Sequence, residues 1–99
     1  MYDQSFSIAH NPEKSRFETS VAGLTALVDY MLIGKKIIYT HTEVPETLEG
    51  SGIGSALARH VLDFARENGL QVMPLCPFIA AYIRKHPEYR DIVVAGFAL

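Results

Sequence analysis

Ninety-nine residues give room for one folded domain over residues 1–99, since 48% of them are hydrophobic and 20% are charged. The net charge of −2 gives no electrostatic reason to expect a nucleic-acid partner. One cysteine, Cys76, excludes an internal disulfide, and no apolar run approaches the roughly 18 residues of a membrane span. We therefore expect a cytoplasmic, intracellular protein without a membrane partner. We also expect no metal site, because no Cys/His cluster has the spacing of metal ligands.

The N-terminal half predicts a meander of four antiparallel strands, because apolar and polar residues alternate between turn signals. The first strand is short and contains Phe6 and Ile8. In the third, every second residue from Leu24 to Leu32 is expected on one side. The remaining expected strands and turns are a turn at Asn11-Pro12, a strand over 16–21, a hairpin at Ala22-Gly23, the third strand over 24–33, a turn at Gly34-Lys35 and a strand over 37–44.

After residue 50 the apolar residues recur at helical spacing, which predicts a helix from Ile53 to Ala65 with Ser51 as its N-cap. Asn68-Gly69 supplies its C-terminal stop. A buried strand over 70–73 follows. Pro77 begins a second helix, and His86-Pro87 ends it, with Phe78, Ala81, Tyr82 and Lys85 on one face. The run Ile92-Val93-Val94 is either a last strand or a packed tail.

This order of elements predicts an α/β fold built on a mixed sheet. The helix between the fourth and fifth strands implies a parallel crossover, so an antiparallel meander is followed by a β-α-β-α unit. Where the two parallel strands splay, the backbone groups of both are free to bind an extended ligand.

The stretch Gly50-Ser51-Gly52-Ile53-Gly54-Ser55 is the most informative part of the chain. It opens a helix with almost no side chains, so unpaired N–H groups and the positive end of the helix dipole point at one spot, where a diphosphate can bind. The alternative is a tight turn at Gly50 and Gly52, with Gly54 a close-packing position. The spacing excludes the Gly-x-Gly-x-x-Gly dinucleotide motif and the triphosphate P-loop.

Four segments together resemble the GCN5-related N-acetyltransferases (GNAT), specifically the small members of that family. The resemblance extends from about Phe6 to about Val94. The segments match the central strand, the pyrophosphate loop with its helix, the fifth strand with its exit, and the last helix. They are His41-Thr42-Glu43-Val44-Pro45, Gly50 to Leu57, Val72 to Phe78, and Ala80 to Tyr89.

The resemblance implies that acetyl-CoA is the cosubstrate, with its pyrophosphate on main-chain N–H groups of the glycine loop and its pantetheine arm beside the fourth strand. Cys76 lies where the sulfur end of CoA is expected. Lys85 and His86 end the last helix. Either they contact the 3′-phosphate or adenine of CoA, or Lys85 is solvated and His86 caps the C-terminus of the helix. The cofactor-binding residues expected are Thr42, Glu43, Val44, Gly50, Ser51, Gly52, Ile53, Gly54, Ser55, Cys76, Tyr82 and Lys85.

Two features depart from the family pattern. Glu49 stands where the loop usually begins with Gln or Arg, and we expect this carboxylate to face solvent, away from a diphosphate. The Asn11-Pro12 turn replaces the helices between the first two strands, which normally help to build the acceptor site. We therefore expect an acceptor pocket that is open or completed by a partner.

Four residues are catalytic candidates. The resemblance places Tyr82 where it can protonate the CoA sulfur, although it could equally be a packed core tyrosine. His41 and Glu43, two apart on a strand, share a face and are candidate bases; the alternative is a solvated polar pair. Cys76 is either an acetyl-accepting nucleophile or an inert buried residue. Direct attack by the amine in a ternary complex is the preferred mechanism.

The leading hypothesis is therefore an acetyl-CoA-dependent N-acetyltransferase. Its acceptor is a primary amine: a protein lysine or N-terminus, or a small amine. The alternatives are a non-catalytic CoA-binding sensor or interaction module, and an interaction domain without any cofactor. We expect a monomer or a weak dimer.

Overall fold

The computed structural model describes residues 6–99 and contains a five-stranded sheet in the order β1-β2-β3-β4-β5. The first four strands pair antiparallel and β4 pairs parallel with β5, which confirms the predicted mixed sheet and crossover. The elements are β1 (Ala9–Asn11), β2 (Arg16–Val21), β3 (Leu24–Ile33), β4 (Lys36–Glu43), η2 (Glu46–Leu48), α1 (Ile53–Glu67), β5 (Gln71–Pro74), α2 (Pro77–Lys85) and η3 (Pro87–Ile92).

The first strand differs from its prediction. Pairing with β2 begins at Ala9, opposite Glu18, so Phe6 and Ile8 lie before the strand and are half-buried against the core. The turn that follows Asn11 sets this register, and it leaves only three residues of β1 opposite β2.

The predicted cap of α1 is also wrong by one residue. The N-cap is Gly52, in the left-handed conformation, and it has no side-chain hydrogen bond. The Ser51 hydroxyl instead donates to the carbonyl of Leu48, 2.5 Å away, because the chain turns tightly out of η2 just before α1.

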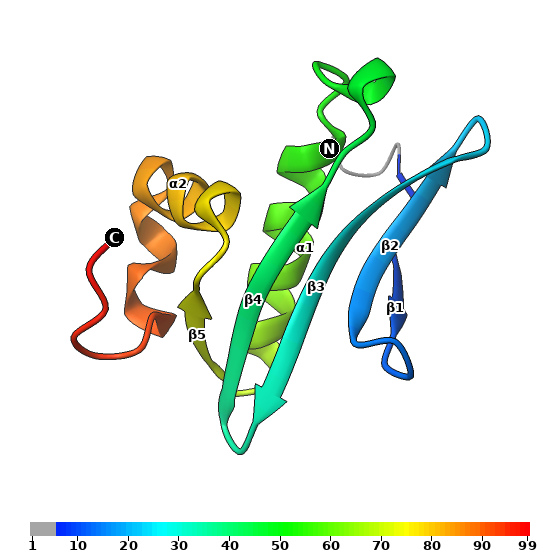
Figure 1. Ribbon diagram of the computed structural model, residues 1–99. Coiled ribbons are helices and arrows are strands. Elements are labelled where there is room, and N and C mark those ends of the chain that lie inside the picture. The colour runs from blue at the N-terminus through cyan, green and yellow to red at the C-terminus, as the bar shows by residue number, and fades with distance from the viewer. Residues whose placement is uncertain (1–5) are drawn as a thin grey trace.

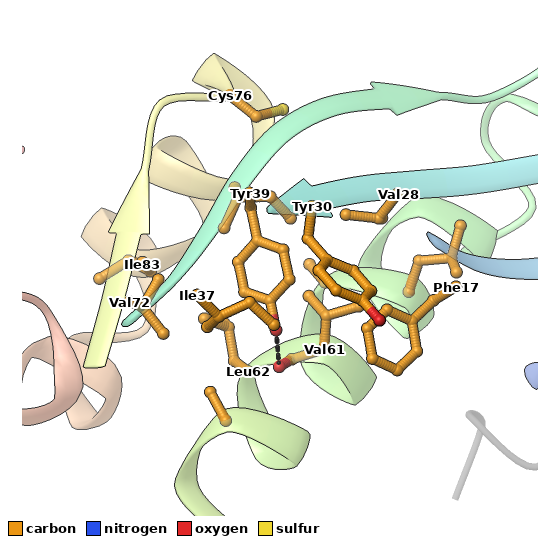
Figure 2. Close-up of a cluster of buried hydrophobic side chains, with 14 of the residues drawn as sticks. Phe17, Val28, Tyr30, Ile37, Tyr39, Val61, Leu62, Val72, Cys76 and Ile83 are labelled. Carbon is orange, nitrogen blue, oxygen red and sulfur yellow. Dashed lines mark hydrogen bonds between the residues drawn. The ribbon is translucent and has the colours of Figure 1, made fainter. Parts of the chain in front are cut away.

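The core lies between the sheet and α1, which is drawn behind β3 and β4 in Figure 1. Alternation along β3 buries Ala26, Val28 and Tyr30 on this side as predicted. Leu24 and Leu32, at the ends of the same row, stay exposed. Figure 2 shows the Tyr39 ring reaching from β4 to α1, where its hydroxyl donates to the carbonyl of Val61 at 2.6 Å.

The second helix buries Ile79, Ala80 and Ile83. Phe78, Ala81, Tyr82 and Lys85, which the spacing places on one face, are exposed or half-buried. Pro77 and His86 do bound the helix as expected.

The C-terminal segment is a packed tail rather than a full strand. η3 is followed by a single parallel bridge between Val72 and Val93. Arg66 of α1 holds this segment through two hydrogen bonds of 2.8 and 2.9 Å to Asp91. The hydrogen bond from Arg66 holds the pKa of Asp91 below its usual value.

An irregularity in β4 decides which residues face the core. The β3–β4 register shifts between Asp29 and Tyr30, so Asp29 pairs with His41 while Tyr30 pairs with Tyr39. Thr40 is the extra residue of a β-bulge. Because side chains alternate along a strand, this extra residue turns His41 away from the face that Tyr39 occupies.

Candidate functional site

A cleft of about 710 Å³ lies where the end of β4 meets the start of α1. Its walls come from four parts of the chain: the end of β4, the loop through η2 and the glycines, the first turn of α1, and the first turn of α2. The lining residues are Thr42, Glu43, Val44, Leu48, Glu49, Gly50, Gly52, Gly54, Ser55 and Phe78.

The glycine loop presents unpaired backbone donors at this cleft. Gly50 and Gly52 have φ of 87° and 92°, a conformation that favours glycine. Within residues 6–99, the backbone N–H groups of Gly50, Gly52, Gly54 and Ser55 have no hydrogen-bond partner. These donors and the positive end of the α1 dipole can together bind an anion.

The other two residues of the loop have different positions. Ser51 is exposed but does not line the cleft, since its hydroxyl bonds to Leu48. Ile53 is 1% exposed and packs in the core, so only its backbone is part of the loop surface.

Gly54 is a close-packing position, which was one of the two interpretations of this glycine that the sequence allowed. A Cβ placed on Gly54 would lie 2.9 Å from the Cζ of Phe78. The ring of Phe78, 42% exposed, forms a wall of the cleft and reaches the bare backbone of α1. A physical constraint therefore favours glycine at each of these positions. It is the left-handed backbone conformation at Gly50 and Gly52, and the lack of space for a side chain at Gly54.

The two parallel strands diverge at the cleft. Their last link is a hydrogen bond of 2.9 Å from the Cys76 N–H to the Tyr39 carbonyl. The rest of β4, through Glu43, has no backbone partner on the β5 side among the described residues. At the point of divergence the Cys76 thiol lies 3.1 Å from the Thr42 hydroxyl, and Cys76 is buried.

His41 and Glu43 lie together, as the strand spacing predicted. His41 Nε2 is 3.7 Å from Glu43 Oε2, and their side chains are 57% and 65% exposed. Both follow the bulge and point away from α1, whereas Thr42, opposite Val28, points toward it and contacts Cys76. The structure therefore brings Cys76 to Thr42, and it records no contact between Cys76 and His41 in the described residues.

Tyr82 and Lys85 lie farther along α2 and do not line the cleft. The Tyr82 ring is stacked on His86, with ring centroids 3.9 Å apart. His86 caps the helix as expected, because its Nδ1 donates to the Tyr82 carbonyl at 2.9 Å. Lys85 is exposed.

Sequence reasoning missed two apolar wall residues, Leu48 and Phe78. The signal at Phe78 was a large apolar side chain in the first helical turn after Pro77, on a face that the core does not use. Glu49 is exposed, as expected, and it also lines the cleft. Since no Lys, Arg or His within residues 6–99 lines the cleft, an anion there depends on backbone N–H groups and on neutral hydroxyls such as that of Ser55.

Two further findings limit the kinds of site in the described chain. No group of three or more His, Cys, Asp or Glu side chains in residues 6–99 could hold a metal ion. No helix in the same residues has the length and apolar character needed to cross a bilayer.

Comparison with known proteins assigns the family. The family model of the GCN5-related N-acetyltransferases matches residues 16–92. The chain belongs to this family. It is 32% identical to Protein NATD1 of Mus musculus over 81% of this chain and 76% of that protein. It is also 32% identical to the Homo sapiens protein of the same name, over 81% and 74%.

A solved structure supports the same assignment. A GCN5-like protein from Staphylococcus aureus, determined by NMR, superimposes with a TM-score of 0.71 and is 26% identical. The match covers 89% of this chain and 87% of the other. The chain therefore has the GNAT acetyltransferase fold, and the cleft between β4 and α1 is the candidate site within it.

Proposed function

We propose that this protein transfers the acetyl group of acetyl-CoA to a primary amine. The observation that carries the proposal is the meeting of two unsatisfied backbone surfaces in one cleft. One is the set of free N–H groups at the start of α1, and the other is the free edge of β4. A ligand with a diphosphate at one end and amide groups along its length satisfies both.

The diphosphate of acetyl-CoA would accept hydrogen bonds from the N–H groups of Gly52, Gly54 and Ser55. Bonds from neutral donors to an ionised acceptor are strong, and the α1 dipole adds to them. The carboxylates of Glu43 and Glu49 oppose the negative ligand, so this part of the site works through backbone N–H groups and the neutral hydroxyl of Ser55.

The pantetheine arm would lie along the free edge of β4 past Val44, Glu43 and Thr42. β5 stops pairing with β4 at the Cys76–Tyr39 hydrogen bond, and beyond this point the amides of the arm would pair with β4 in place of a strand. The Phe78 ring and Leu48 supply apolar contact on the opposite wall. The thioester would then lie where β4 and β5 diverge.

The reaction we propose is direct attack in a ternary complex. The amine nitrogen, having lost a proton to His41 or Glu43 directly or through water, forms a bond to the thioester carbon. The carbon–sulfur bond then breaks, the CoA thiolate takes a proton from Tyr82, and the amide nitrogen releases its remaining extra proton through water to the Tyr82 phenolate. In this scheme Cys76 forms no acetyl-enzyme, and its thiol packs against Thr42. Lys85 remains a candidate contact for the outer phosphate of CoA.

The test is a calorimetric titration with acetyl-CoA and with S-acetylpantetheine, which keeps the thioester and arm but lacks the diphosphate. We expect acetyl-CoA to bind and S-acetylpantetheine to bind at least roughly tenfold more weakly, the factor equivalent to about 1.4 kcal/mol. Equal binding of the two ligands would contradict a diphosphate site at α1.

Labelled acetyl-CoA and a panel of amines then test the chemistry. Transfer to at least one primary amine is the expected result. Tight acetyl-CoA binding without any acceptor would instead favour a CoA-binding sensor, and the absence of binding would favour an interaction domain.

A further inference from the structure

The sheet has one open face. In Figure 1, β3 and β4 lie in front of α1, and no element covers them on the viewer's side. Residues that pair across strands share a face, so the side chains on this side can be identified from the register. The row that crosses the middle of the open face is Met31, Ile38 and Met73.

This row is apolar and partly uncovered. Met31 is 51% exposed, and Ile33, two residues along the same face of β3, is 57% exposed. Ile38 and Met73 are half-buried. We call Met31, Ile33, Ile38 and Met73 the open-face patch. Scattered single apolar residues are ordinary, but adjacent ones on three strands mark an interaction surface.

The patch lies on the same face as the candidate base pair. His41 pairs with Asp29 and Glu43 pairs with Leu27, both on the open side, because the bulge at Thr40 turns them there. Glu43 lies five positions after Ile38, and one of the four residues between them is the bulge residue Thr40. At about 3.3 Å per residue, the patch and Glu43 are on the order of 13 Å apart along the strand.

The charged side chains around Glu43 on the open face are mostly negative. Glu18, Asp29 and Glu43 lie on this face, while the one arginine there, Arg16, already pairs with Asp29 at 3.1 Å and with Glu18 at 3.9 Å. In residues 6–99 the ion-pair partner of Glu43 is His41. This end of the face is therefore complementary to a cation. The other end is complementary to an apolar side chain, with the exposed Lys36 at its margin opposite Ile33.

We propose that the open face binds the acceptor, and that the acceptor is an extended protein segment with a lysine and an apolar residue four to five positions apart. The apolar residue would contact the open-face patch while the lysine amine reaches His41 and Glu43 at the end of β4. This inference rests on the proposed acetyl transfer. It adds the class of acceptor and the surface that selects it.

Synthetic ten-residue peptides test the spacing. Each contains one lysine and one leucine in a Gly/Ser background, with the leucine one to eight positions away on either side. With acetyl-CoA saturating, we expect kcat/KM to be highest at separations of four to five residues. It should exceed that of a leucine-free peptide by roughly tenfold, a gain equivalent to about 1.4 kcal/mol of apolar contact. A flat profile would overturn the proposal.

Matched variants test the surface. Met31→Glu and Ile33→Glu each place a carboxylate in the patch, and Leu32→Glu is the control, because Leu32 is 56% exposed on the opposite face of the same strand. The patch variants should lose the advantage of the leucine-containing peptide, whereas acetylation of the leucine-free peptide and calorimetric binding of acetyl-CoA stay unchanged. Leu32→Glu should leave all three measurements unchanged.

Two outcomes separate the inference from the function on which it rests. If the wild-type protein does not bind acetyl-CoA, the proposed function fails and this inference fails with it. If acetyl-CoA binds and small amines are acetylated, but patch and control variants behave alike toward every peptide, only the inference fails. Sedimentation that shows a dimer dissociated by Met31→Glu would also overturn it, because the patch would then be the contact with a second copy.

Discussion

The Cys76 thiol lies 3.1 Å from the Thr42 hydroxyl, at the point where β4 and β5 separate. This pair joins the N-cap residue of α2, two residues after β5, to the edge of the candidate site, and Cys76 is 3% exposed. The thiol is thus held by packing and by a neighbouring hydroxyl, and no basic partner to it is recorded in the described residues.

We expect Cys76→Ala to keep acetyl transfer within about threefold of wild type, because direct attack needs no acetyl-enzyme. The variant should lose roughly 1 kcal/mol of unfolding free energy, since a buried atom and its contacts are removed. Steady-state kinetics and urea denaturation measure the two effects. Mass spectrometry of the wild-type protein incubated with acetyl-CoA alone tests for an acetyl-enzyme. An acetyl group found on Cys76 would contradict direct attack.

Tyr82→Phe should lower kcat about 100-fold if the phenol protonates the leaving thiolate, within the range of general acid catalysis. Tyr89→Phe is the matched control on the neighbouring element. The Tyr89 hydroxyl donates to Asp63 at 2.7 Å, and burial, together with this hydrogen bond, raises the pKa of Tyr89. The control should therefore lose stability and keep kcat. Equal kcat in Tyr82→Phe and wild type would remove Tyr82 from the mechanism.

Gly54→Ala should push the Phe78 ring out of its position, since the new Cβ would lie 2.9 Å from the ring. The ring is half-exposed and can move, and alanine favours a helix over glycine by about 1 kcal/mol, so we expect little change in stability. Acetyl-CoA affinity should fall because the wall of the cleft changes.

The double variant Gly54→Ala/Phe78→Ala tests whether the ring transmits this effect. In the Phe78→Ala background, Gly54→Ala should leave calorimetric affinity unchanged and raise the unfolding free energy. An equal loss of affinity in both backgrounds would mean that the Cβ itself obstructs the ligand.

Gly52→Ala should cost roughly 1–2 kcal/mol of unfolding free energy, because a side chain is strained at a φ of 92°. It should also weaken acetyl-CoA binding, since the N–H groups that open α1 lose their orientation. Gly96→Ala is the matched control, with a φ of 85° in the C-terminal tail. Denaturation should show similar losses in the two variants, and calorimetry should show weaker binding in Gly52→Ala alone.

Stability should fall as pH decreases through and below about 6.5, the ordinary pKa of histidine. The His10 ring is stacked on Phe17, with centroids 4.3 Å apart, and its Nε2 is 2.6 Å from the Tyr30 hydroxyl. Burial, and then repulsion from His60, lower the pKa of His10. The unfolded chain therefore takes up the proton first, and folding is fully favoured only above this range.

Denaturant unfolding at pH 7.5, 6.5 and 5.5 measures this dependence. His10→Gln should flatten it and His60→Gln should reduce it. A slope that His10→Gln leaves unchanged would assign the effect to other groups.

Local sequence patterns were sufficient to predict most of the strands and the topology of the sheet. Alternation predicted β2, β3 and β4 within one residue, and the parallel crossover followed from the helix between β4 and β5. The first strand was misplaced because its register depends on pairing with β2, which no local period encodes. Which residues of α2 are buried was not predicted, because packing against α1 and the sheet selects Ile79, Ala80 and Ile83.

The sequence by itself determined the glycine loop at the start of a helix, the strands beside it and the family to which the chain belongs. These are matters of backbone conformation and local period. Only the tertiary structure decided that the Thr40 bulge turns His41 and Glu43 onto the open face, that Phe78 occupies the space at Gly54, and that Cys76 meets Thr42. Each of these depends on how residues distant in the chain pack. One extra residue in a strand moves the side chains that follow it to the other face, and only pairing with the neighbouring strand determines where that extra residue lies.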